Sequence, residues 1–195
     1  MLTGSPEAHS SETGRTDRRS VLVLPHARIA QVNDHFCGPA TAQMLVRSRI
    51  GAGPGQADLG ERMTGPAGTD RTAMRDTLTA ELGREYTVRT LAEGEPLTQA
   101  QRAQLFTDVR AAADAGYGIA LCVLTQDGGP RPSWFPDRPG DPIDHWLAVF
   151  GYDVPGERIL VADPAVWGLD GLPPGTGSHW IAVADLARYT KVYVY

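Results

Sequence analysis

The sequence is short of cysteine and of long apolar segments. Its 195 residues contain only two cysteines, Cys37 and Cys122, too few for a disulfide framework, and in a reducing cytosol both are expected to be free thiols. No apolar run approaches the ~18 residues that span a bilayer, and VLVLP after the polar N-terminus is too short for the core of a signal peptide. These absences predict a cytoplasmic protein without a membrane partner.

Lysine is also scarce, and acidic residues outnumber basic ones. The formal net charge is −5, and Lys191 is the only lysine among 18 basic residues. This balance argues against a nucleic acid partner, because little would neutralise a phosphate backbone. Abundant Arg, Ala, Gly and Pro are typical of a GC-rich bacterial genome. Nothing in the composition indicates a cofactor or an oligomeric state.

The order of the expected elements predicts one α+β domain. Residues 1–19 have little to bury and are expected to form a disordered N-terminal arm before a domain over 20–195. Hydrophobic spacing and Gly or Pro boundaries predict helices at 36–50, 56–63, 71–82 and 98–115, and strands at 118–124, 145–153, 158–164 and 191–195. Helices followed by strands favour an N-terminal helical part packed on a C-terminal antiparallel sheet.

Cys37 is the first candidate for chemistry. It stands in QVNDHFCGPATAQML, just before Gly38-Pro39 and the start of a predicted helix. A thiol becomes a good nucleophile when a helix N-terminus or an imidazolium stabilises the thiolate. The helix is supplied locally, and Gly38 leaves room for close approach. A buried, inert role is the alternative for any cysteine, and we expect it for Cys122 within IALCVL.

A nearby imidazolium must come from elsewhere in the chain, and His145 is the best placed histidine. It opens a strand directly after the loop 127–142, which holds five Pro and three Gly. If 145–150 and 158–163 pair as a hairpin, alternation brings Asp163 near His145 to orient the ring. A one-residue slip would separate them. Asp144 and Asp153 are the rival orienters.

The remaining candidates concern oxyanion and substrate binding. The backbone N–H of Cys37 and the side-chain amide of Gln31 are expected to hold a developing oxyanion. Trp134 and Phe135 in the long loop are expected to form a cleft wall or lid, whereas core packing is expected for Trp146. Two residues beside the thiol, Asp34 and His35, are further substrate-binding candidates. A zinc site formed by Asp34, His35 and Cys37 matches no common ligand spacing, so no metal is expected.

These segments resemble papain-like cysteine peptidases of the bacteriocin-processing type, which cleave double-glycine leaders. LPHARIAQVNDHFCGPATAQML is similar to their start, where a Gln precedes by six residues the Cys that opens a helix as C-G-P-A. DHWLAVFGYD and ILVADPA resemble their second half, in which a His begins one strand and Asp-Pro closes the next. GTDRTAMRDTLTAELG resembles the helix in between.

The resemblance covers about residues 24 to 195 and implies a papain-like fold. It implies the roles already inferred: Cys37 as nucleophile and His145 as base, Asp163 as orienter and Gln31 as oxyanion donor. The chain departs from the pattern in its longer loop 127–142 and in showing no fused transporter.

The leading hypothesis is therefore a thiol-dependent hydrolase that cleaves a peptide or amide bond, with peptide or natural-product maturation as a plausible setting. Two alternatives stay open. An acyl or peptidyl transferase would pass the same acyl-Cys thioester to an amine instead of water. A non-catalytic binding module would keep the fold without a reactive thiol.

Overall fold

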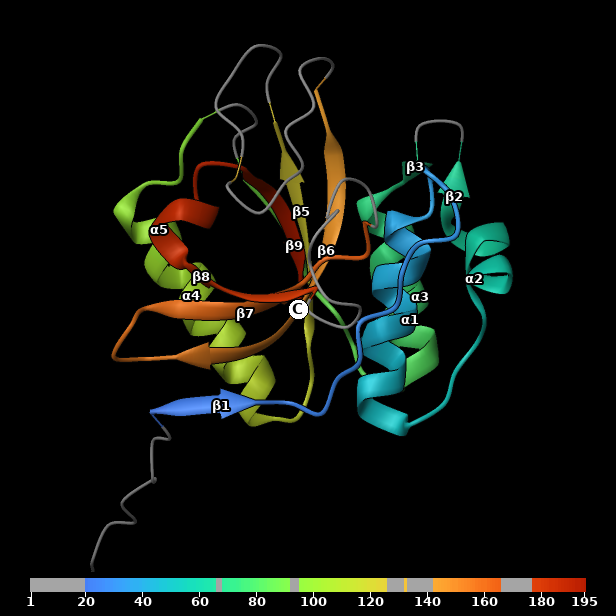
Figure 1. Ribbon diagram of the computed structural model, residues 1–195, viewed down its shortest axis with the longest axis horizontal. Coiled ribbons are helices and arrows are strands. Elements are labelled where there is room, and N and C mark those ends of the chain that lie inside the picture. Colours follow the sequence, from blue (N-terminus) through green and yellow to red (C-terminus); the bar gives the residue numbers. More distant parts are fainter. Residues whose placement is uncertain (1–19, 66–67, 92–94, 126–131, 133–141, 166–176) are drawn as a thin grey trace, which may run out of the picture.

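The computed structural model describes residues 20–65, 68–91, 95–125, 132, 142–165 and 177–195. The expected arm 1–19 and the candidates Trp134 and Phe135 lie outside these ranges. Within them, one antiparallel sheet forms the centre of the protein (Figure 1). Its strands are β1 (Val21–Val23), β4 (Val88–Thr90), β5 (Ile119–Leu124), β6 (Asp144–Asp153), β7 (Arg158–Ala162), β8 (Ser178–Ala182) and β9 (Thr190–Val194).

The sheet order is β4-β9-β5-β6-β7-β8, and β1 pairs with β6. A separate two-stranded sheet joins β2 (Thr64–Gly65) to β3 (Gly68–Thr69). The helices are α1 (Cys37–Ile50), α2 (Gln56–Met63), α3 (Arg71–Leu82), α4 (Gln99–Asp114) and the short α5 (Val183–Leu186). The four longer helices agree with the sequence prediction to within a residue or two at each end.

Local chemistry explains these helix boundaries. The Asp70 carboxylate caps α3 by accepting from the Thr72 and Ala73 amides at 2.7 and 3.4 Å. The same helix ends at Gly83, whose φ of 61° is a left-handed conformation that glycine adopts at little cost. Thr98 and Gln101 form a capping box at the start of α4.

Helices cover both faces of the sheet, a feature that the sequence did not predict. Helices α1, α2 and α3 pack on one face, and α4 and α5 pack on the other (Figure 1). Strand alternation supplies both cores: Trp146, Ala148 and Phe150 of β6 face the α1 side, whereas Leu147 and Val149 face the α4 side. An α+β fold with a helical N-terminal part and an antiparallel sheet is confirmed.

Six short elements escaped the sequence analysis: β1, β2, β3, β4, β8 and α5. Each has five residues or fewer, so hydrophobic periodicity hardly develops within it. Pairing within the central sheet stabilises three of them: β1 on β6, β4 on β9 and β8 on β7. As a result the strands are interleaved with the helices along the chain instead of following them.

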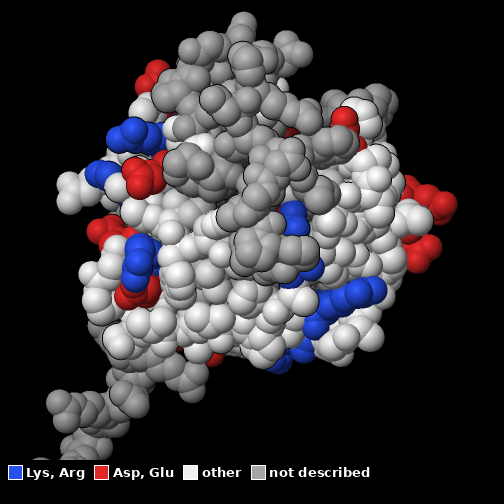
Figure 2. Space-filling view, viewed as in Figure 1, with Lys and Arg blue, Asp and Glu red and all other residues white. Residues whose placement is uncertain are grey.

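Helix length and surface charge are relevant to membrane and nucleic acid partners. No helix in the described part of the chain is long and apolar enough to cross a membrane. On the face shown in Figure 2, acidic and basic side chains lie side by side on the left, whereas the described basic side chains gather over the centre and lower right and acidic ones lie at the right edge.

Candidate active site

Cys37 is the first residue of α1, and its side chain is buried near the helix N-terminus. The residue is 8% exposed, and the side chain of Phe36 does not cap the N–H groups of Cys37 and Gly38, the two amides that precede Pro39. A Cβ on Gly38 would lie 2.1 Å from Thr69 Oγ1. Glycine is therefore required here because β3 packs directly on the first turn of α1.

His145 and Asp163 meet through the predicted hairpin. Strands β6 and β7 pair antiparallel with Ala148 opposite Ala162 and Val149 opposite Val161. Continuing this register places Asp163 opposite Leu147. Leu147 is two residues from His145 and on the same face of β6, so Asp163 and His145 are diagonal neighbours. The imidazole spans that diagonal, and His145 Nε2 lies 2.7 Å from Asp163 Oδ1.

The second ring nitrogen of His145, Nδ1, can hydrogen-bond to the Cys37 thiol. Because Nε2 is engaged by Asp163, Nδ1 is the nitrogen available to Cys37, which is a hydrogen-bonding neighbour of His145. Burial alone disfavours the imidazolium. The charge and hydrogen bond of Asp163, followed by Cys37, outweigh burial and raise the pKa of His145 to about 10.

This raised pKa predicts a pH dependence of stability. A histidine with a pKa near 6.5 when unfolded and about 10 when folded stabilises the protein fully below pH 6.5. The contribution is lost as pH rises towards 10, because the folded state then holds a proton that the unfolded state has released. Because the Cys37 thiol is coupled to this imidazole, the comparison is made in a Cys37→Ala background. There we expect the free energy of unfolding to fall by up to about 1.4 kcal/mol per pH unit more steeply with His145 than with His145→Gln between pH 7 and 8.5. Urea denaturation at both pH values measures this slope, and parallel slopes would contradict it.

Asp163 is held in place by its own backbone segment and by Arg28. Its Oδ1 accepts from the Ala165 amide at 2.8 Å, which forms a tight turn around Pro164. Arg28 Nε donates to the Asp163 carbonyl at 2.7 Å, and its Nη2 donates to the Ala165 carbonyl at 2.5 Å. One guanidinium thus fixes both ends of the turn. The sequence analysis missed Arg28, since no local pattern links residues 135 positions apart.

Gln31 lies beside the same turn. Its backbone N–H donates to the Pro164 carbonyl at 2.9 Å, and the residue is 7% exposed. The side-chain amide donates one hydrogen to the Asn33 carbonyl at 2.7 Å. Because an amide NH₂ carries two hydrogens, one donor remains for another acceptor.

The rival residues have other partners. Asp144 accepts a hydrogen bond from the Cys122 thiol at 2.8 Å and pairs with Lys191, while Asp153 pairs with Arg158. Burial, and then the charge of Asp144, hold the pKa of Cys122 well above its usual value, as suits an unreactive thiol.

Asp34 and His35, the substrate-binding candidates within the described residues, lie at the surface. Both are exposed just before α1. No group of three or more potential metal ligands occurs among the described residues. Trp146 is in the core as expected, at 3% exposure, but its Nε1 also donates to the Thr69 carbonyl at 3.0 Å and so links the sheet to β3.

Comparison with known proteins gives a family match over most of the chain. Residues 23–170 match the sequence profile described as the Peptidase_C39 like family. Among curated proteins, no sequence matches at a significant level.

Solved structures show the same fold. The peptidase domain of Streptococcus ComA, a bi-functional ABC transporter involved in a quorum sensing pathway, is 16% identical with a TM-score of 0.51, covering 87% of this chain and 96% of that one. A double glycine motif protease from an AMS/PCAT transporter, solved with its leader peptide, is 12% identical with a TM-score of 0.54, covering 88% and 91%. Xylellain, a cysteine protease from Xylella fastidiosa, is 9% identical with a TM-score of 0.55, covering 90% and 85%.

Proposed function

Because this chain belongs to the C39-like peptidase family and is thus a cysteine peptidase-like hydrolase, we propose that it cleaves a peptide or amide bond with Cys37 as nucleophile. The single observation that carries this proposal is the continuous contact from Cys37 through His145 to Asp163, with 2.7 Å between His145 Nε2 and Asp163 Oδ1. A thiol, an imidazole and a carboxylate in this sequence are the parts that thiol-dependent acyl chemistry needs.

The proposed reaction has two steps. The Cys37 thiolate attacks the scissile carbonyl carbon, and a C–S bond forms as the C–N bond breaks. His145, protonated on Nδ1, gives that proton to the leaving amine. Water then attacks the thioester and loses a proton to His145. The C–S bond breaks, the acid is released, and the imidazolium–thiolate pair is restored.

Asp163 acts by orienting the ring. Its carboxylate accepts the Nε2–H, which keeps Nδ1 towards Cys37 and stabilises the imidazolium in both steps. Arg28 fixes the turn after Asp163, and the turn holds the carboxylate beside His145 instead of letting it rotate towards solvent. Removing Asp163 should therefore reduce the stabilisation of the Cys37 thiolate and also slow the proton transfer by His145.

We propose peptides as the substrate class and peptide maturation as the setting. Support comes from the family and from the similar protease that was solved with a leader peptide. Incubation with a pool of quenched fluorescent peptides, together with mass mapping of a peptidyl thiol probe, tests the function. Cleavage with label on Cys37 supports it. Absence of both for the folded chain would remove it.

The Gln31 amide provides a prediction for the oxyanion. Gln31→Ala is expected to lower kcat roughly 10²–10³-fold, because it deletes the free N–H donor that we assign to the developing oxyanion. Steady-state cleavage of the best peptide from the pool measures the effect. Gln31→Glu is the matched control: it keeps the side-chain size but replaces the NH₂ donor by an acceptor, and it should be no better than Ala. An unchanged kcat for Gln31→Ala would assign the oxyanion to backbone amides alone.

A further inference from the structure

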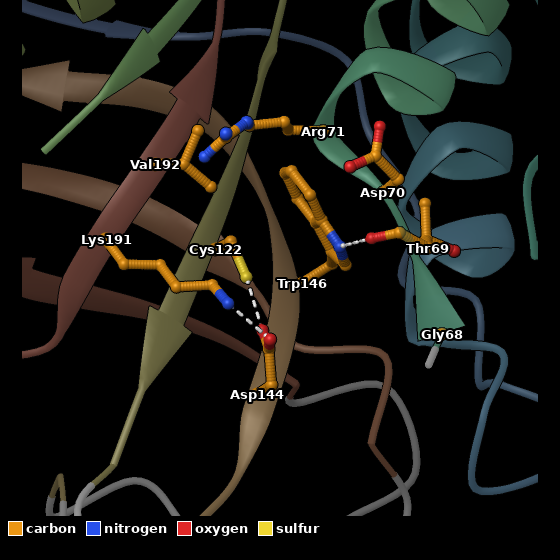
Figure 3. A pocket seen from close by; sticks show the side chains of 9 residues that line it. All are labelled: Gly68, Thr69, Asp70, Arg71, Cys122, Asp144, Trp146, Lys191 and Val192. Carbon is orange, nitrogen blue, oxygen red and sulfur yellow. Dashed lines mark hydrogen bonds and ion pairs between the residues drawn. The ribbon is translucent and has the colours of Figure 1, made fainter. Parts of the chain in front are cut away.

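A cavity of about 310 Å³ lies between the helical part and the sheet (Figure 3). Its lining comes from β3, the start of α3, β5, β6 and β9: Gly68, Thr69, Asp70, Arg71, Cys122, Asp144, Trp146, Lys191 and Val192. The volume is at the small end of the ~300–1,000 Å³ range of ligand pockets. It therefore suits one side chain of a peptide better than a cofactor.

The cavity adjoins the candidate active site. Asp144 and Trp146, which line it, precede and follow His145 in β6, and by strand alternation their side chains leave the strand on the face opposite to that of His145. Thr69, on the opposite wall, packs on Gly38 next to Cys37. A peptide whose scissile carbonyl reaches Cys37 would thus have a residue close to that bond within reach of the cavity.

The carboxylates that line the cavity are already engaged. Asp70 caps α3 through the Thr72 and Ala73 amides. Asp144 accepts from the Cys122 thiol and pairs with Lys191. Neither is left to favour a cationic ligand.

Arg71 differs from these residues. It is exposed and forms no ion pair or side-chain hydrogen bond with the described part of the chain. In Figure 3 its guanidinium points away from Asp70 and reaches across the cavity towards Val192 of β9. A guanidinium presents several N–H donors in a planar fork that matches a carboxylate. The ammonium of Lys191 is paired with Asp144, so Arg71 supplies the positive charge that a ligand would meet.

We propose that this cavity is a specificity pocket for a carboxylate of the peptide substrate, with Arg71 as the recognition residue. The proposal rests on the proposed function, since it names the substrate feature read beside Cys37. The carboxylate belongs to a Glu or Asp side chain near the scissile bond or to a peptide C-terminus. Trp146 forms an aromatic wall of the pocket against which the aliphatic part of that residue packs.

Binding to a Cys37→Ala variant tests the pocket without turnover. The probes are N-acetyl-Gly-Glu-Gly-amide, its Gln analogue, and N-acetyl-Gly-Gln-Gly with a free C-terminus. Chemical shifts of the Trp146 indole N–H report binding at the cavity wall. We expect one of the two carboxylate peptides to bind about 10-fold more tightly than the Gln amide, as for a hydrogen bond to a charged partner, and which one binds identifies the source.

Arg71→Gln in the same background should abolish that preference. Arg75→Gln is the matched control, because Arg75 lies one turn later on α3 and pairs with Asp76 outside the cavity; it should keep the preference. Thermal unfolding midpoints establish that both variants are folded.

Equal affinities for all three peptides, absence of a Trp146 shift, or a preference that survives Arg71→Gln would each overturn the pocket. None of these outcomes depends on thiol reactivity. A carboxylate preference without labelling of Cys37 in the wild type would support the pocket and contradict the hydrolase. Labelling of Cys37 without a carboxylate preference would support the hydrolase and contradict the pocket.

Discussion

Cys37→Ala is expected to abolish peptide cleavage, with a fall in kcat/KM of at least roughly 10⁴-fold. The reason is that the proposed reaction passes through a covalent thioester, and neither a methyl group nor water held at the same place can form one. Water attack aided by His145 would leave only a small residual rate. Cleavage of the best peptide from the fluorescent pool, followed to long times, measures the loss.

Two controls make this result specific. Arg47→Ala changes an exposed side chain near the far end of the same helix and should leave the rate unchanged. The thermal unfolding midpoint of Cys37→Ala should stay near that of wild type, because a small side chain at the helix start is replaced by a similar one. A Cys37→Ala protein that cleaves at the normal rate would end the hypothesis of a thiol nucleophile.

His145→Ala is expected to lower the rate of peptide cleavage by about 10³-fold or more. The same change should also make the Cys37 thiol unreactive towards alkylation at low pH. At pH 6 only about 0.3% of an ordinary cysteine is thiolate. If His145 activates Cys37 as we propose, iodoacetamide should alkylate Cys37 of the wild type faster than free cysteine at that pH. In His145→Ala the rate should fall to that of free cysteine or below it, since the thiol is buried.

Asp163→Asn separates charge from position. Asparagine keeps a side chain of the same size beside His145 but removes the negative charge that raises the pKa of the imidazole. We expect both cleavage and alkylation at pH 6 to lie between wild type and His145→Ala. Mass mapping after alkylation identifies the labelled cysteine. Equal alkylation rates in wild type and His145→Ala would show that the imidazole does not activate Cys37.

Much of the fold followed from local patterns in the chain. The helices over Cys37–Ile50, Gln56–Met63 and Arg71–Leu82 are each bounded by Gly, Pro or a capping side chain, and the structure confirms them. The hairpin of β6 and β7 is also confirmed, because its apolar strands flank a short turn with Pro and Gly. These signals act within a few residues, so one sequence is enough to detect them.

The candidate site needed a longer argument. Cys37, His145 and Asp163 were chosen because the thiol opens a helix and the other two begin and follow paired strands. The register of β6 on β7 shifts by one residue between Val149 and Gly151, and this shift puts Asp163 opposite Leu147, on the face of His145. No local pattern in the sequence predicts it. Their roles in catalysis remain our proposal, for the experiments above to test.

The sequence by itself determined the helices, the main hairpin and the types of reactive residue, because each depends on neighbours along the chain. Only the tertiary structure decided that α4 lies on the opposite face of the sheet, that Arg28 fixes the turn after β7, and that Arg71 faces a cavity beside His145. The physical reason is that these features depend on which surfaces pack together. Packing joins residues far apart in the chain, and no local pattern records such a pairing.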